Sequence, residues 1–140
     1  MSKIMAIDYG DAHVGIAFSD LSQTLAGDAF TLHERNLERV VLAIKSYVFD
    51  NDVSEIVLGY PKNMNATIGP RGEKSELLAA TLRSVCCIPV ILWDERQTTV
   101  AAHQILNATG TRGKNRKNKI DAVAATLILQ GYLDFKTMHK

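Results

Sequence analysis

The sequence predicts a mixed α/β fold, in which a five-stranded sheet carries helices on both faces. Two strand-like segments near the N-terminus are separated only by residues 9–12, which is the length of a hairpin connection, so they should pair antiparallel. Two later segments are continuous apolar runs, which are typical of strands covered on both faces. Helical periodicity separates these later strands, and strands joined through helices run parallel in one sheet. A hairpin beside parallel strands makes the sheet mixed.

The N-terminal half of the chain predicts three strands and one helix. An apolar run at residues 4–7 predicts a buried strand that ends at Asp8, and the alternating segment 13–19 predicts its hairpin partner. Residues 29–32 predict a third strand. The period then becomes that of an amphipathic helix, with Asn36 as its expected N-cap. The apolar positions of this helix are Leu37, Val40, Val41, Ile44 and Val48.

The C-terminal half alternates strands with helices. Apolar runs at residues 55–60 and 90–93 predict the fourth and fifth strands. The other expected elements, in chain order, are a loop over residues 61–72, a helix that carries Leu78, Leu82 and Val85, a helix capped by Thr98 or Thr99 that extends through Leu106, a basic loop over residues 112–119, and a last helix that starts near residues 120–121.

Length and composition exclude several classes of protein. The 140 residues suit one domain, 1–140, and 46% hydrophobic with 22% charged residues excludes a disordered chain. Because the net charge is only +1, any affinity for nucleic acid must come from a local patch. We see no apolar run of membrane-spanning length and no secretory leader, and the adjacent Cys86 and Cys87 suit reduced thiols. We therefore expect a cytoplasmic protein with no membrane partner.

Three carboxylates stand where an open α/β sheet places its ligands, at strand ends and helix starts. Asp8 ends the first strand, Glu95 follows Asp94 at the end of the fifth, and Asp121 opens the last helix. If they converge in one cleft they repel one another unless a cation lies between them, and Mg²⁺ prefers such oxygen ligands. Each also has a simpler interpretation: Asp8 as a turn residue, Asp121 as a helix-start aspartate, and Glu95 as part of a solvated loop.

Basic residues gather just before Asp121. They are Arg112, Lys114, Arg116, Lys117 and Lys119. Such a cluster is typical of a clamp on the phosphate backbone of a nucleic acid, although a solvated loop explains the charges equally well. Arg71, beside Gly69-Pro70, and Arg96 are expected to extend the same surface.

Four groups of residues together resemble a known family along nearly the whole chain. These groups are Asp8-Tyr9-Gly10 with residues 15–20, residues 58–65 with 69–71, residues 94–99, and residues 120–125 with Ile128-Leu129. The chain is similar to the YqgF family of Holliday junction resolvases, also called pre-16S rRNA nucleases, in the RuvC-like branch of the ribonuclease-H superfamily. The resemblance implies a ribonuclease-H-like fold and an acidic triad of Asp8, Glu95 and Asp121, which would be catalytic and would bind Mg²⁺ or alternatively Mn²⁺.

The resemblance also implies an activity, that of a Mg²⁺-dependent endonuclease acting on structured nucleic acid. Its implied target is the 5′ end of the 16S rRNA precursor in ribosome biogenesis, with a branched DNA junction as the alternative. Contacts to phosphate look alike for RNA and DNA, so the residues do not choose between them. A resolvase that cuts two strands symmetrically should be a homodimer, whereas an RNA-processing enzyme can be a monomer.

Two other functions stay open at this level. The family usually has a basic residue where this chain has His13, and often another at Ala12, and these departures favour a non-catalytic RNA- or ribosome-binding factor on a nuclease-like scaffold. An actin- or sugar-kinase-like phosphotransferase also carries Asp-x-Gly in its first hairpin, but it needs a second domain for which this length leaves no room. The four histidines, at positions 13, 33, 103 and 139, show no metal-ligand spacing and are expected to be structural or at the surface.

Overall fold

The computed structural model describes residues 2–10, 13–60, 70–94 and 114–138, with the backbone alone for residues 70, 71 and 114–119. The strands are β1 (Lys3–Tyr9), β2 (His13–Ser19), β3 (Ala26–His33), β4 (Val53–Tyr60) and β5 (Val90–Asp94). The helices in these ranges are α1 (Leu37–Asp50), α2 (Pro70–Cys86) and α4 (Lys114–Met138).

The strands form one five-stranded sheet in the order β3-β2-β1-β4-β5. β2 pairs antiparallel with both β1 and β3, as the short hairpin connection predicts. β4 pairs parallel with β1, and β5 pairs parallel with β4, because helices carry the chain back between these strands. The predicted mixed sheet is therefore confirmed.

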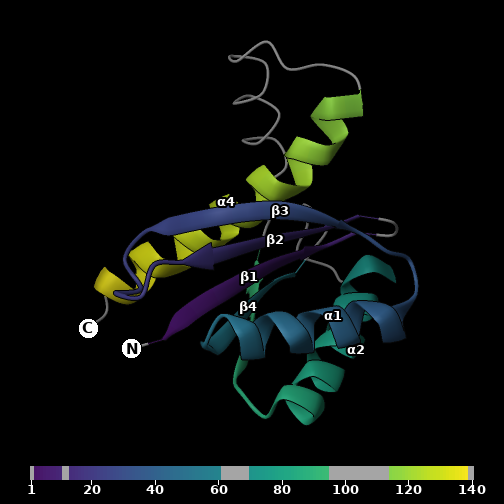
Figure 1. Ribbon diagram of the computed structural model, residues 1–140, viewed down its shortest axis with the longest axis horizontal. Coiled ribbons are helices and arrows are strands. Elements are labelled where there is room, and N and C mark those ends of the chain that lie inside the picture. The colour runs from purple at the N-terminus through teal and green to yellow at the C-terminus, as the bar shows by residue number, and fades with distance from the viewer. Residues whose placement is uncertain (1, 11–12, 61–69, 95–113, 139–140) are drawn as a thin grey trace.

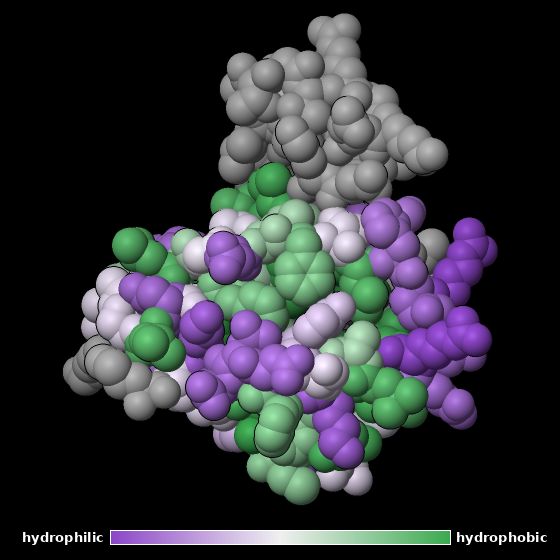
Figure 2. Space-filling view, in the orientation of Figure 1, coloured by the Kyte–Doolittle hydropathy of each residue, from purple (hydrophilic) through white to green (hydrophobic). Residues whose placement is uncertain are grey.

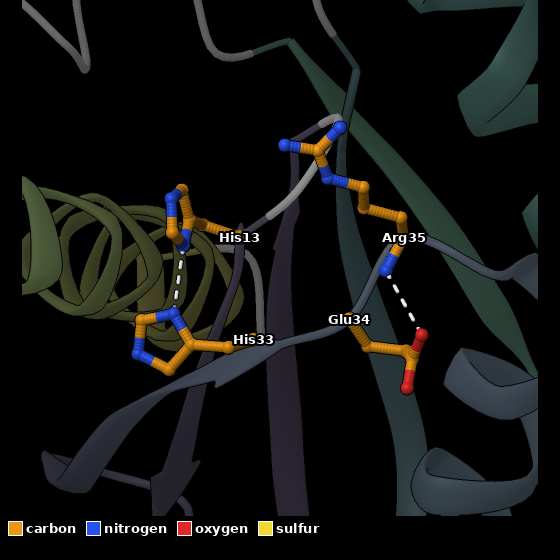
Figure 3. A pocket seen from close by; sticks show the side chains of 4 residues that line it. All are labelled: His13, His33, Glu34 and Arg35. Carbon is orange, nitrogen blue, oxygen red and sulfur yellow. Dashed lines mark hydrogen bonds between the residues drawn. The ribbon is translucent and has the colours of Figure 1, made fainter.

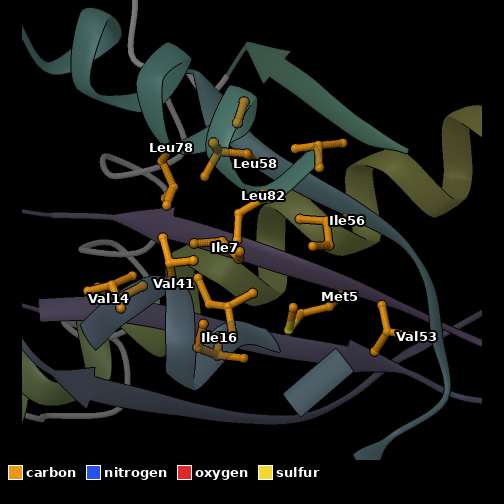
Figure 4. Close-up of a cluster of buried hydrophobic side chains, with 14 of the residues drawn as sticks. Met5, Ile7, Val14, Ile16, Val41, Val53, Ile56, Leu58, Leu78 and Leu82 are labelled. Carbon is orange, nitrogen blue, oxygen red and sulfur yellow. The ribbon is translucent and has the colours of Figure 1, made fainter. Parts of the chain in front are cut away.

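Helices cover both faces of the sheet (Figure 1). α1 and α2 lie on one face, where Val41 and Leu82 join a buried cluster with Met5 and Ile7 of β1 (Figure 4). α4 lies across the other face, where its Leu129 packs in a second cluster. The two clusters form separate hydrophobic layers on either side of one sheet.

Alternation along β1 explains its continuous apolar sequence. Met5 and Ile7 belong to the cluster beneath α1 and α2, whereas Ile4 and Ala6 belong to the cluster beneath α4. All four side chains are fully buried, because successive residues of a strand point to opposite faces and both faces are covered. Asp8 is the next residue in the series of Ile4 and Ala6, so it lies on the α4 face.

The N-cap of α1 is confirmed at Asn36. Its side chain accepts a hydrogen bond from the backbone N–H of Arg39, which satisfies one of the N–H groups that a helix start leaves unpaired. The predicted apolar stripe faces the sheet, with Val40, Val41 and Ile44 buried. Local capping and periodicity thus determine this helix.

Two predicted boundaries are wrong. Residues 70–72, expected to belong to a loop over 61–72, are helical, because α2 begins at Pro70 and proline suits the first turn of a helix. The basic loop expected over residues 112–119 is helical from Lys114, because lysine and arginine favour helices and nothing there breaks one. Asp121 accordingly lies about two turns inside α4 rather than at its start. Arg112 and the helix predicted through Leu106 lie outside the described residues.

No helix in the described ranges is long and apolar enough to cross a membrane. The visible surface is mixed, with hydrophilic and hydrophobic residues interspersed and many hydrophilic ones over the connection from β3 to α1 (Figure 2).

Candidate active site

The carboxyl ends of the three parallel strands meet at one edge of the sheet. Ile7 of β1 is level with Leu58 of β4, which is level with Leu92 of β5. Asp8 is the residue directly after Ile7 on β1, and Asp94 is the last residue of β5. Ligands of open α/β sheets bind at this edge, so the structure places Asp8 where the sequence predicts a site.

Asp8 is nearly buried, with 9% of its surface exposed. A carboxylate in such a place stays charged only if hydrogen bonds or a cation compensate for the lost water. The side chain lies on the α4 face, beyond Ala6 in the alternation of β1.

Gly15 sets α4 directly against the sheet beside Asp8. Gly15 is the cross-strand partner of Asp8 in the pairing of β1 with β2. A Cβ atom at Gly15 would lie 2.0 Å from the backbone carbonyl oxygen of Asp121 and 3.3 Å from the Cβ of Ala125. Only a residue without a side chain permits this approach. The fold thus places the backbone of Asp121 against the cross-strand partner of Asp8, although 113 positions separate Asp8 from Asp121 in the sequence (121 − 8).

The third predicted carboxylate, Glu95, lies outside the described residues. Its neighbour Asp94 ends β5, next to Tyr60 of β4 in the register. Trp93 packs against the α4 cluster, so Asp94, the next residue, lies on the opposite face from Asp8. Among the described residues no three potential metal ligands gather, which leaves the pair of Asp8 and Asp121 as the described part of the predicted triad.

The predicted cationic residues fall on helix starts wherever the structure describes them. Lys114, Arg116, Lys117 and Lys119 occupy the first two turns of α4, immediately before Asp121. Arg71 is the second residue of α2. Arg96 and Arg112 lie outside the described residues. These basic residues on α4 therefore directly precede Asp121 on the same helix.

A tyrosine–glutamate pair at the same edge was not foreseen. Tyr60 ends β4 and donates a hydrogen bond to Glu76 of α2. This hydrogen bond, burial and the negative charges of Glu76 and Glu73 raise the pKa of Tyr60 above its ordinary value of 10.0. Sixteen positions separate the two residues, and no local spacing rule links a strand end to the following helix.

The Glu76→Gln variant is expected to lower the pKa of Tyr60 toward the value of a free tyrosine. The substitution keeps a hydrogen-bond acceptor but removes the carboxylate charge that disfavours phenolate. A spectroscopic pH titration of phenolate absorbance checks this, since the difference curve between variant and wild type isolates the affected tyrosine. Identical titration curves would show that the carboxylate does not control Tyr60.

A histidine pair was also missed. His13 at the start of β2 and His33 at the end of β3 are cross-strand partners, and their Nδ1 atoms are 2.8 Å apart. The sequence expectation of surface histidines without metal spacing is compatible with this arrangement. Only the β2–β3 register, which the sequence does not fix, brings them together.

Comparison with known proteins identifies the family. The family model described as RuvX, Holliday junction resolvase, matches residues 2–135. The chain belongs to this family. It is therefore a member of a family of nucleases, and its resemblance to that family, expected from the motifs, is confirmed.

Curated members of the RuvX family are similar over nearly their whole length. A protein of Caldanaerobacter subterraneus named "Putative pre-16S rRNA nuclease" is 44% identical over 134 residues, covering 94% of this chain and 96% of that protein. A protein of the same name from Bacillus subtilis is 41% identical over 134 residues, and the alignment covers 94% of this chain and 97% of that protein.

Solved structures show the same fold at low sequence identity. RuvC of T. thermophilus in complex with a Holliday junction substrate aligns with a TM-score of 0.61 at 12% identity, over 98% of both chains. The yeast mitochondrial Holliday junction resolvase Ydc2 aligns with a TM-score of 0.56 at 12% identity, over 97% of this chain and 79% of that chain. The RuvX-family chain thus has the ribonuclease-H-like fold that the motifs imply.

Proposed function

We propose that this RuvX-family chain is a Mg²⁺-dependent endonuclease that processes the 5′ end of the 16S rRNA precursor. The observation that carries the proposal is the contact at Gly15, which sets the backbone of Asp121 beside the nearly buried Asp8. Family membership and the names of the curated relatives support nuclease activity and an rRNA precursor as substrate.

The donor set suits a hard divalent cation. Asp8 on β1 and Asp121 on α4 offer carboxylate oxygens, and the backbone of Asp121 lies against Gly15, the cross-strand partner of Asp8. Glu95 directly follows the end of β5 in the sequence. These three residues would hold Mg²⁺, or Mn²⁺ in its place, because both ions prefer oxygen ligands. Bound there, the ion supplies activation of water and stabilisation of the leaving oxygen in phosphodiester hydrolysis. The fold holds the Asp8 carboxylate at a strand end where little water reaches it.

Basic residues around the carboxylates are proposed to hold the phosphate backbone. Lys114, Arg116, Lys117 and Lys119 on α4, Arg71 on α2, and Arg96 and Arg112 are the candidates. The first turns of α4 combine these cations with backbone N–H groups that favour anions. A substrate held there lies along the helix that leads to Asp121.

The double variant Arg116→Ala/Lys117→Ala is expected to bind RNA and DNA more weakly at every sequence. Each phosphate contact that is lost removes about one counterion, so the slope of log affinity against log salt should flatten by up to about two. Fluorescence anisotropy across a salt series measures the slope. The control, Arg39→Ala/Lys45→Ala on α1, lies on the opposite face of the sheet and should keep the wild-type slope; equal slopes in all three proteins would place the nucleic acid elsewhere.

The substrate is tested by cleavage of a precursor 16S fragment beside a four-way DNA junction, each with Mg²⁺ and with a chelator. The proposal expects Mg²⁺-dependent cutting of the RNA near the mature 5′ end. Cutting of the junction alone, by a two-fold dimer, would instead favour resolution of branched DNA, which the family description supports. Binding of either probe without cleavage would overturn the proposal in favour of a non-catalytic factor.

A further inference from the structure

Trp93 lies on β5, at one end of the strand order, and packs against the side of α4. The centroid of its ring is 5.5 Å from that of Tyr132 and 5.6 Å from that of Phe135. The interplanar angles are 80° and 64°, so neither ring is stacked parallel to the indole. A Cβ atom at Gly131 would lie 3.7 Å from the indole Nε1. All three of these neighbours belong to α4.

The face of the sheet beneath α4 is covered unevenly. Ala6 of β1, Ala17 of β2 and Val57 of β4 are 0% exposed on this face. Trp93 is partly exposed, and Phe135 beside it is 46% exposed. Water therefore reaches two large aromatic rings at the β5 side of α4, whereas small and aliphatic side chains nearer the middle of the sheet are sealed.

Tyr132 gives the indole a rigid support. Its hydroxyl donates a hydrogen bond to Glu55 of β4, and the Nζ of Lys136 lies 5.5 Å from the centroid of its ring. Lys136 is in turn 3.3 Å from the Glu55 carboxylate. These contacts hold the Tyr132 ring, which is 7% exposed, against Trp93. A surface that is already rigid loses little conformational entropy when a planar ligand binds to it.

Trp93 stands level with Asp8 and on the same face of the sheet. Ile7 is the partner of Leu58 in the pairing of β1 with β4, and Gly59 is the partner of Trp93 in the pairing of β4 with β5. Asp8, Gly59 and Trp93 thus form one row across three neighbouring strands, and Gly59 places no side chain between the other two. Two strand spacings amount to about 10 Å. A nucleic-acid strand with a phosphate near Asp8 therefore brings a neighbouring base within reach of the indole.

The two flanks of this edge of the sheet differ in chemistry. On the β3 flank the described side chains are polar, and they line a shallow, open pocket of about 380 Å³ (Figure 3). These side chains are those of His13, His33, Glu34 and Arg35. On the β5 flank the indole of Trp93 and the ring of Phe135 are accessible instead. A nucleobase has large apolar faces, so the β5 flank is the side that suits a base.

We propose that Trp93, supported by Tyr132 and Phe135, is a stacking platform for one unpaired base of the RNA that reaches Asp8. The inference rests on the proposed nuclease function and adds a feature of the substrate to it, a single-stranded nucleotide beside the carboxylates. Stacking on an aromatic side chain accepts any base, because every base has a planar face. The platform contributes affinity for unpaired RNA and takes no part in the chemical step.

Trp93 is the single tryptophan of the chain, so the intrinsic fluorescence reports on this residue alone. The protein is titrated in chelator with a short single-stranded RNA, with the same RNA annealed to its complement, and with inorganic polyphosphate. Stacking predicts strong quenching by the single strand and much weaker quenching by the duplex, whose bases are already paired. Polyphosphate should bind without quenching, because it has charge and no bases. Equal quenching by polyphosphate and single-stranded RNA would overturn the proposal.

Trp93→Leu removes the ring and keeps an apolar side chain on β5. It should bind the single-stranded RNA about tenfold more weakly, with an unchanged slope of log affinity against log salt, because no phosphate contact is lost. Trp93→Phe keeps a ring and should recover most of the affinity. The matched control Phe49→Leu changes an 85% exposed ring on α1, on the other side of the sheet, and should bind as the wild type does.

Wild-type affinity in Trp93→Leu would overturn the platform. Urea denaturation measures the stability of each variant, and the fluorescence titration of the wild type needs no variant, so it decides the question if Trp93→Leu is unstable. A change in the salt slope equal to that of Arg116→Ala/Lys117→Ala would also overturn the platform, since it would mean that phosphate contacts were lost.

The outcomes separate the platform from the nuclease function. Mg²⁺-dependent cleavage of the precursor RNA by the wild type, without quenching by single-stranded RNA, overturns the platform alone. Quenching by single-stranded RNA without any cleavage supports the platform and overturns the proposed nuclease function. In a protein that cleaves, Trp93→Leu should raise KM and leave kcat unchanged, because the platform holds the base equally before and during the reaction.

Discussion

Replacing Asp8 by Asn is expected to reduce Mg²⁺-dependent cleavage by about a thousandfold or more. Asn keeps the shape of the side chain and its capacity to accept hydrogen bonds but removes the negative charge. If that carboxylate holds a cation, the variant binds the cation less well. The cation then stabilises less of the charge that develops in the transition state, a contribution of several kcal/mol. The measurement is the single-turnover rate on the precursor RNA.

Two controls make this result specific. Asp28→Asn changes an exposed carboxylate of β3 and should leave the rate unchanged. The affinity of Asp8→Asn for RNA in chelator should stay near that of the wild type, because the basic residues provide the phosphate contacts. Equal cleavage rates for Asp8→Asn and the wild type would remove Asp8 from the proposed active site.

Gly15→Ala is expected to have the largest effect on stability, a loss of about 3 kcal/mol or more in the free energy of unfolding. The new Cβ would lie 2.0 Å from the Asp121 carbonyl oxygen, and that oxygen belongs to helix backbone, which cannot rotate away. α4 must then move off the sheet, which disturbs the packing beneath it and the position of Asp121. Urea denaturation measures the loss, and cleavage should fall with it.

Gly131→Ala is the matched control on the same helix. Its Cβ would meet the Trp93 ring at 3.7 Å, an ordinary contact, and alanine favours helix over glycine by about 1 kcal/mol. This variant should be as stable as the wild type or more so. If Gly15→Ala were equally stable, α4 would not be held against β2 as described.

Local patterns predicted most of the sheet. The hairpin connection fixed the antiparallel pairing of β1 with β2, and the Asn36 cap marked the start of α1, because both depend on residues close in sequence. The start of α4 was missed for a related reason. Charge repulsion among Lys114, Arg116 and the neighbouring lysines suggested a loop, but lysine and arginine have good helical propensity and Gly113 lies before the helix.

The sequence allowed the candidate carboxylates to be selected, but it did not predict the side-chain contacts around them. Asp8 could be selected because it ends a buried strand, and Asp121 because it precedes a run of small residues that permits close approach. The pairs His13–His33 and Tyr60–Glu76 depend on strand register and on helix placement over the sheet. Those are properties of tertiary packing, which residue spacing does not encode.

Binding of Mn²⁺, followed by electron paramagnetic resonance, tests most directly whether Asp8 and Asp121 form a divalent-cation site. Wild type, Asp8→Asn, Asp121→Asn and the exposed control Asp28→Asn are titrated under the same conditions. Carboxylate ligation predicts that the wild type and Asp28→Asn bind Mn²⁺ alike, and that each active-site variant binds about tenfold more weakly or worse. Equal binding by all four proteins, or no binding by the wild type, would contradict it.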